Sequence, residues 1–222
     1  MSNHGAITID GPVAAGKTVV GMLVARTIAC RFLDTGAMYR AVAWAALEEG
    51  IDLDDEEALE KLANRMDMRL VQVDGGQRLL VDGEDITDYL REPEVEQGVS
   101  PVAKVPGVRA AMRAQQRIIA VDGDIVMAGR DIGTVVLPDA PVKIFLTASV
   151  EVRARRRHEE MLHAGRLAEY DQVLTDLKRR DKIDSERDDS PLRPADDSVI
   201  IDTDSLGINE IAREIIDCAE RN

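Results

Sequence analysis

The most constraining feature of this chain is a glycine-rich segment between an apolar run and a helical pattern. The segment reads Gly11-Pro12-Val13-Ala14-Ala15-Gly16-Lys17-Thr18 and matches G-x-x-x-x-G-K-[ST], the pattern of a phosphate-binding P-loop. The glycines allow the sharp turn that brings several backbone N–H groups near polyphosphate oxygens. Lys17 adds a cation for the β and γ phosphates, and Thr18 offers a hydroxyl to Mg²⁺. A chance glycine turn is the alternative, and the two flanks favour a nucleoside triphosphate site.

Composition narrows the class of protein. At 222 residues the chain is long enough for one main domain with an inserted or mobile lobe. The net charge of −14 argues against nonspecific binding to nucleic acid or to an anionic membrane. No apolar run approaches the ~18 residues that span a bilayer, and the N-terminus has no basic and apolar leader. We therefore expect a cytoplasmic protein with neither a nucleic-acid polymer nor a membrane as partner.

Short apolar runs alternate with helical patterns along the chain. This alternation predicts an α/β fold with a parallel sheet covered by helices on both faces. The last helix is expected to bury one face, since Ile208, Ile211, Ala212, Ile215, Ile216 and Ala219 recur at helical spacing. The expected strands are residues 6–9, 125–128, 142–146 and 199–201, with a short fifth strand at 32–33.

Two segments depart from this alternation. Residues 68–73 and 78–81 flank a glycine turn and read as an antiparallel pair, which places a small insert at 67–90 within a substrate lobe at about 34–100. Lysines and arginines concentrate in 153–190. A solvated helix face explains such a run in most proteins, but the P-loop makes a phosphate-binding lid a competing interpretation. We expect both parts to belong to a single domain covering 1–222.

Three further clusters fall where the carboxyl edge of the sheet is expected, which is the usual ligand crevice of an open α/β sheet. Each has an ordinary reading alone: a helix cap at Asp34-Thr35, a surface turn at Arg130-Asp131, and a salt bridge between Arg180 and Asp184. Together with the P-loop they predict a triphosphate site facing a monophosphate site. The clusters are Leu33 to Arg40, Gly129 to Gly133, and the trio Arg180, Asp184 and Arg187, which share a face if that segment is helical.

The order of these motifs closely resembles the bacterial cytidylate (CMP/dCMP) kinases. The phrases LDTGAMYR and GRDIGTVV are much more specific than the P-loop, and SPVAKVPGVR, PVKIFLTAS and RRDKIDSER complete the resemblance. The resemblance implies a P-loop nucleoside monophosphate kinase fold, with an inserted substrate lobe and an arginine-bearing helical lid. One departure is Val19, where many members carry a second small or hydroxyl residue.

The resemblance also implies a role for individual residues. Residues 11–18 would bind ATP, and Thr18 would contact Mg²⁺. The phosphate of CMP would be held by Thr35, Tyr39, Arg40 and Arg130. The cytosine edge would be read by Ser100, Arg109 and Asp131. From the lid, Arg180, Asp184 and Arg187 would reach the sugar and the phosphates. The residues expected to act in catalysis are Lys17, Arg130, Arg180 and Arg187.

The predicted activity is transfer of the γ-phosphoryl group of ATP to CMP or dCMP by a monomeric, Mg²⁺-dependent enzyme of pyrimidine nucleotide metabolism. The nearest rival is a kinase for UMP, AMP or dTMP. A rival of another class is a P-loop switch that hydrolyses ATP or GTP, with Asp202 at the end of the last strand as a metal ligand. The chain has no N-K-x-D string for reading guanine, which disfavours a GTP-dependent switch.

Overall fold

The structure is a computed structural model that describes residues 5–73 and 76–221. It divides into two compact units. Unit 1 comprises residues up to Leu33 together with those from Gly123 onward, and unit 2 comprises Asp34–Asp122. Across the described ranges, no helix combines the length and the apolar character that a membrane span requires.

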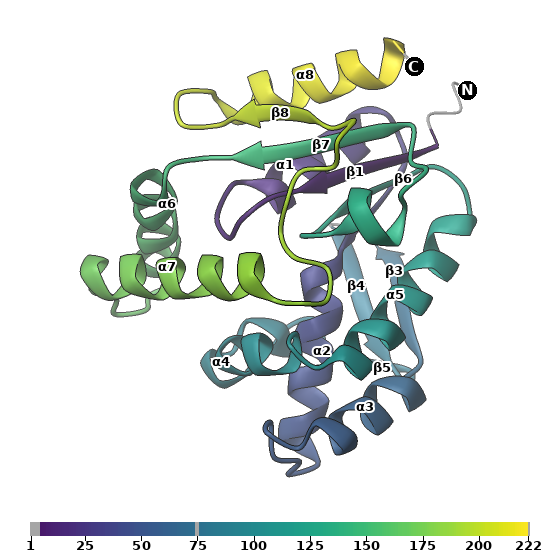
Figure 1. The fold of residues 1–222 in the computed structure, drawn as a ribbon, viewed down its shortest axis with the longest axis vertical. Helices are drawn as coiled ribbons and strands as arrows, with labels where there is room; N and C mark the ends of the chain where they lie inside the picture. Colours follow the sequence, from purple (N-terminus) through teal and green to yellow (C-terminus); the bar gives the residue numbers. More distant parts are fainter. Residues whose placement is uncertain (1–4, 74–75, 222) are drawn as a thin grey trace. The chain divides into compact units, whose positions relative to one another are not determined.

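Unit 1 is built on a parallel sheet, as the alternation of strands and helices predicts. The strand order is β2-β6-β1-β7-β8, so the strand that precedes the P-loop is central and has β6 and β7 as its neighbours (Figure 1). All five predicted strands are therefore confirmed. The elements of this sheet are β1 (Ala6–Asp10), β2 (Arg31–Asp34), β6 (Ile125–Ala128), β7 (Val142–Thr147) and β8 (Val199–Asp202).

The two faces of the central strand carry different residues. Ile7 and Ile9 are fully buried and pack with α1 (Lys17–Thr27) and α8 (Ile208–Arg221), which cover one face of the sheet. Because side chains alternate along a strand, Thr8 and Asp10 point to the opposite face. There they meet η2 (Ile132–Val136), a short π-helical turn that follows β6.

The last helix largely matches its prediction. Ile211, Ala212, Ile215 and Ala219 are buried in the core of unit 1, and Ile216 is partly buried against it. Ile208 is the exception, with 49% of its surface exposed. It is the first residue of α8, and a helix end covers less of the core than its middle turns.

The cationic segment folds as two packed helices, α6 (Val150–His163) and α7 (Tyr170–Glu186). Ala154, Val173 and Leu177 form a small apolar cluster between them. Val13 of the P-loop also packs against this cluster. The segment is thus more than a solvated helix face, since its apolar side is joined to the nucleotide loop within unit 1.

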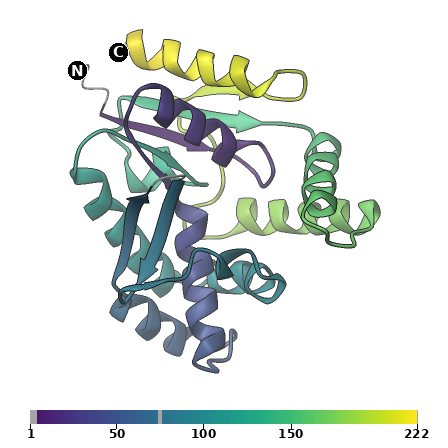
Figure 2. The same ribbon diagram turned by 180° about the vertical axis from the view of Figure 1, so that it is seen from behind.

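Unit 2 combines helices with a small antiparallel sheet of order β3-β4-β5, seen from behind in Figure 2. The predicted pairing of 68–73 with 78–81 is confirmed, with Leu70 opposite Leu79; part of the turn, Asp74-Gly75, lies outside the described residues. The only tryptophan, Trp44, stacks on Tyr89 with 6.1 Å between ring centroids. The elements are α2 (Thr35–Glu48), α3 (Glu56–Arg65), β3 (Met68–Val73), β4 (Gly76–Val81), β5 (Glu84–Asp85), η1 (Tyr89–Arg91), α4 (Pro93–Val102) and α5 (Pro106–Val121).

Candidate active site

The P-loop joins the carboxyl end of β1 to α1. Gly11 has φ of +147°, and a Cβ on this residue would lie 2.2 Å from the carbonyl oxygen of Leu146, so only glycine fits. Gly16, with φ of +92°, is the N-cap of α1 and presents no side chain to the first turn of that helix. No capping side chain therefore occupies the positive end of α1, and an anion can bind to the N–H groups there.

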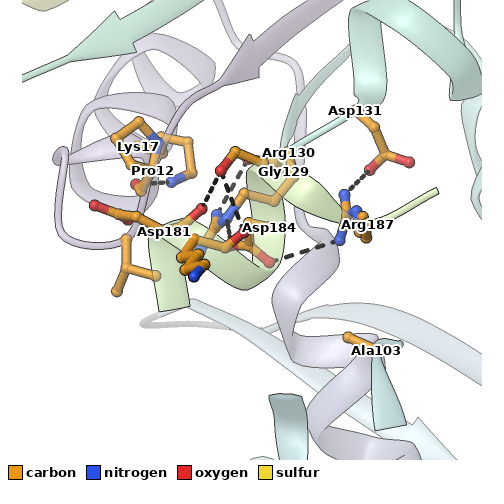
Figure 3. A network of polar contacts seen from close by, with 12 residues as sticks. Pro12, Lys17, Ala103, Gly129, Arg130, Asp131, Asp181, Asp184 and Arg187 are labelled. Carbon is orange, nitrogen blue, oxygen red and sulfur yellow. Dashed lines mark hydrogen bonds and ion pairs between the residues drawn. The ribbon is translucent and has the colours of Figure 1, made fainter. Parts of the chain in front are cut away.

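Lys17 bends back over its own loop. Its Nζ donates a hydrogen bond of 2.6 Å to the carbonyl oxygen of Pro12, and the residue is only 8% exposed (Figure 3). Thr18, the next residue of α1, is half-buried. The loop thus holds an ammonium group at its mouth, where phosphate oxygens can replace the carbonyl oxygen as its partner.

Residues of the second and third sequence clusters meet in unit 1. Arg130 Nε donates to Asp184 Oδ2 at 3.0 Å, and Arg187 lies 3.6 Å from Asp184 Oδ1 and 3.8 Å from Asp131 Oδ1 (Figure 3). Burial alone would raise the pKa of Asp184, but Arg130, Arg187 and Arg180 outweigh it and hold that pKa below its usual value. Asp184 is therefore a carboxylate at neutral pH and keeps several guanidinium groups in one place.

The predicted helical face of the third cluster needs one correction. Arg180 and Asp184 lie on α7, but Arg187 is the C-cap of this helix, with an extended ψ of 142°. Its side chain still returns to Asp184, and its Nε donates to the carbonyl oxygen of Ser190 at 2.6 Å. The trio is brought together by this turn as well as by helical periodicity.

The first cluster lies in unit 2, at the start of α2. Asp34 is the helix cap: its Oδ1 accepts the Gly36 N–H at 3.0 Å, and its Oδ2 accepts Arg40 Nη2 at 3.1 Å. Burial is the main influence on the pKa of Arg40 and lowers it, although Asp34 acts in the opposite direction. Thr35, the first residue of α2, is buried. The ion pair fixes the direction of the Arg40 guanidinium.

Unit 2 also pairs two further predicted residues. The Arg109 side chain is almost completely buried, with its guanidinium carbon 5.8 Å from the centroid of the Tyr39 ring, a cation–π contact. Arg109 Nη1 also donates to the carbonyl oxygen of Ala103 at 3.4 Å. Ser100 lies half-buried on α4. Tyr39, Arg40 and Arg109 are thus held by contacts within their own unit.

Two residues that support the site without belonging to it are absent from the sequence prediction. Arg153 of α6 donates hydrogen bonds to the carbonyl oxygens of Ala148 and Val13. It also forms a bidentate salt bridge with Asp181 of α7. Asp10 accepts two backbone N–H groups of η2. Each had one weak signal in the sequence: Arg153 belongs to the cationic run, and Asp10 stands directly before the P-loop.

Comparisons with known proteins agree with this geometry. Residues 7–221 match the family model described as cytidylate kinase. The chain is 50% identical to a cytidylate kinase of Bacillus pumilus, covering all of this chain and 98% of that protein. It is 48% identical to that of Bacillus subtilis, covering 100% and 99%, and 43% identical to that of Carboxydothermus hydrogenoformans, covering 97% of each.

A solved structure supports the fold independently. A gluconokinase from Sinorhizobium meliloti superposes with a TM-score of 0.54 at 16% sequence identity, covering all of this chain and 94% of that one. At this identity the likeness concerns the fold alone.

Proposed function

Because the chain belongs to the cytidylate kinase family, we propose that it transfers the γ-phosphoryl group of ATP to CMP or dCMP, giving ADP and CDP or dCDP. The observation that carries the proposal is the placement, in one compact unit, of a P-loop and a cluster of arginines around Asp184 (Figure 3). A P-loop alone serves many nucleotide reactions. An arginine cluster beside it supplies the charge that a second phosphate group and its transfer require.

The donor site is formed by residues 11–18. Backbone N–H groups of the loop would surround the triphosphate, with Lys17 on the β and γ phosphates. Thr18 suits a magnesium contact, because it lies in the first turn of α1, which has no side-chain cap. Its hydroxyl oxygen is also a ligand of the kind that Mg²⁺ prefers. When bound, Mg²⁺ would neutralise part of the phosphate charge. Only Thr18 is assigned as its protein ligand.

The acceptor residues are assigned one by one, as the family resemblance implies. We assign the CMP phosphate to Thr35, Tyr39, Arg40 and Arg130. We assign the cytosine edge to Ser100, Arg109 and Asp131. The Asp184 carboxylate would contact the sugar while keeping Arg130 and Arg187 in place. Arg180 and Arg187 complete the set on the sugar and the phosphates.

The chemistry needs positioning and charge more than proton transfer. The attacking oxygen belongs to a phosphate with a second pKa of about 6, so most of it is already ionised at neutral pH. No strong general base is then required. Lys17, Arg130, Arg180 and Arg187 would stabilise the charge on the transferring group, and closure of the segment 153–190 would exclude water as a competing acceptor.

We propose that the enzyme is a cytoplasmic monomer, as the sequence analysis expects. It acts on free nucleotides, because a net charge of −14 disfavours binding to nucleic-acid polymers or anionic membranes.

A panel of acceptors tests the proposed activity. ADP release, coupled to a spectroscopic assay, is measured with CMP, dCMP, UMP, AMP and dTMP in turn at fixed ATP and Mg²⁺. We expect CMP and dCMP to give the highest kcat/KM. A higher value for UMP, AMP or dTMP would contradict the assignment of the substrate.

The same assay without acceptor tests the switch alternative. Within the described structure, Asp202 ends the edge strand β8, is exposed, and accepts the Asp204 N–H at 2.9 Å. Strand β7 separates β8 from β1, so Asp202 is poorly placed for a metal at the P-loop. We therefore expect little ATP hydrolysis without an acceptor. ADP release that does not depend on any monophosphate would support the switch alternative.

Proteolysis tests the assignment of 153–190 as a lid. The connection between α6 and α7 contains a fully exposed residue, Leu167, next to a potential trypsin site at Arg166. We expect ATP and CMP together to slow cleavage here more than either nucleotide alone, since both sets of phosphates offset the charges of the segment. The rate is followed by mass spectrometry of the fragments. Equal rates with and without nucleotides would favour an open, solvated segment.

A further inference from the structure

The most unusual carboxylate outside the assigned site is that of Asp10, the last residue of β1. Only 4% of the residue is exposed. Oδ1 accepts the N–H of Ile132 at 2.9 Å, and Oδ2 accepts the N–H of Gly133 at 2.8 Å. Both oxygens are therefore used to hold a backbone turn that lies more than a hundred residues away in the sequence.

That turn directly follows two residues assigned to the acceptor site, Arg130 and Asp131. On their other side, the N–H of Gly129 donates to the carbonyl oxygen of Ile9 at 3.0 Å. The two-residue segment is thus fixed at both ends by neighbouring residues of β1. One anchor is the Ile9 carbonyl and the other is the Asp10 carboxylate.

The turn has little freedom to move toward the strand. A Cβ on Gly133 would lie 2.8 Å from Oγ1 of Thr8 and 3.3 Å from the side chain of Lys143. Thr8 is fully buried on the same face of β1 as Asp10. Close contact sets the height of the turn above the sheet, and the two hydrogen bonds to Asp10 set its position along the strand.

Asp10 also adjoins the donor site. The next residue is Gly11, which has no room for a side chain against the carbonyl oxygen of Leu146. One rigid strand end therefore carries the first residue of the P-loop and the carboxylate that holds the Arg130-Asp131 segment. A shift of Asp10 relative to that segment would change the spacing between donor and acceptor groups.

Keeping a buried carboxylate ionised costs free energy, because the charge is removed from water. Burial raises the pKa of Asp10 from 3.8 to about 6; nearby Asp131 adds to the increase, while the two backbone N–H groups and Lys17 oppose it. A neutral amide of the same shape would avoid the cost of burying a charge, but it has one acceptor oxygen where the carboxylate has two. Only the carboxylate can therefore accept both backbone N–H groups of the turn.

Resting on the proposed function, we propose that Asp10 is a positioning residue for the acceptor: its carboxylate fixes the Arg130-Asp131 segment at the distance from the P-loop that phosphoryl transfer requires. It acts through the two backbone N–H groups and does not touch the substrate.

Asp10→Asn is the direct test. The amide keeps one acceptor oxygen and turns an NH₂ donor toward the second backbone N–H, so one hydrogen bond is lost. We expect KM for CMP to rise about tenfold and kcat to fall, with KM for ATP changed less than about twofold. The matched control is Asp124→Asn. Asp124 lies directly before β6, and its carboxylate also accepts a backbone N–H, that of Gly5, at 2.9 Å. This variant should leave the KM values for CMP and for ATP unchanged.

Stability provides a second readout. Since the folded state binds a proton to Asp10 more tightly than the unfolded chain, this residue makes the wild type less stable as pH rises from about 4 to above 6. Asp10→Asn does not lose stability in this way. The difference in Tm, variant minus wild type, should therefore be larger at pH 7.5 than at pH 4.5. A carboxylate kept for stability would show the opposite trend.

The outcomes decide between these roles. A selective rise in KM for CMP supports positioning, whereas equal changes for both substrates, or none, overturn it. If Asp10→Asn fails to fold, Gly133→Ala decides on the same criterion, because the added Cβ must displace the turn from Thr8. A wild type that prefers another monophosphate would refute the proposed substrate alone, and the comparison of KM values is then made with that monophosphate.

Discussion

Replacing Lys17 with alanine should lower kcat by about 10³-fold while the protein remains folded. Lys17 Nζ is held within the P-loop by a hydrogen bond to the carbonyl oxygen of Pro12. Phosphate oxygens of ATP would take over this ammonium group, and the charge it neutralises is greatest during transfer. The loss should therefore appear mainly in kcat, measured with saturating ATP and CMP.

The control for this prediction is Lys61→Ala. Lys61 is an exposed lysine of α3 that pairs with Glu57, so its removal changes the net charge equally without touching the P-loop. This variant should retain wild-type turnover. Circular dichroism and Tm show whether both variants are folded, and unchanged turnover in a folded Lys17→Ala protein would contradict the donor-site assignment.

Replacing Asp131 with alanine should lower kcat/KM for CMP by roughly 10 to 150-fold, the effect of losing a hydrogen bond to a charged group worth about 1.5 to 3 kcal/mol. Cytosine presents an amino donor where uracil presents a carbonyl acceptor, so a carboxylate favours CMP and repels UMP. UMP should therefore lose less, and the ratio of the two kcat/KM values should narrow.

Asp131→Asn sharpens this test. An amide can turn either its oxygen or its NH₂ group toward the base, so this variant should accept UMP better than Asp131→Ala does. The competing explanation is structural, because Arg187 lies 3.8 Å from the Asp131 carboxylate. If CMP and UMP activity fall by the same factor in Asp131→Ala, that carboxylate serves to hold Arg187 and does not read the base.

The parts of this protein that could be predicted from sequence are those with a local signal. Apolar runs predict each strand of the sheet, and the spacing of glycine, lysine and threonine predicts the P-loop. The helix cap at Asp34 also has a local cause, since its side chain accepts an N–H only two residues away. The sequence left open whether Asp34 or Thr35 is the cap, because both side chains can accept such a bond.

The parts that escaped prediction depend on contacts between distant residues. Asp10 meets Gly133 across 123 positions, and Arg153 meets Val13 across 140. Neither partner is a side chain: one is a backbone N–H and the other a carbonyl, groups that every stretch of chain provides. Residue type therefore carries no information about these pairings. Only the strand order, which places η2 over β1, and the packing of α6 near the P-loop determine them.

The position of the single tryptophan makes the two units spectroscopically distinguishable. Trp44 lies on α2 and stacks on Tyr89, so its emission reports on the surroundings of unit 2, whereas far-ultraviolet circular dichroism averages over helices of both units. Urea unfolding followed by both signals will give coincident transitions if the units unfold together. Separate midpoints would mean that unit 2 can unfold while the sheet of unit 1 and its P-loop remain folded, so that the loop keeps its structure when Tyr39, Arg40 and Arg109 lose theirs.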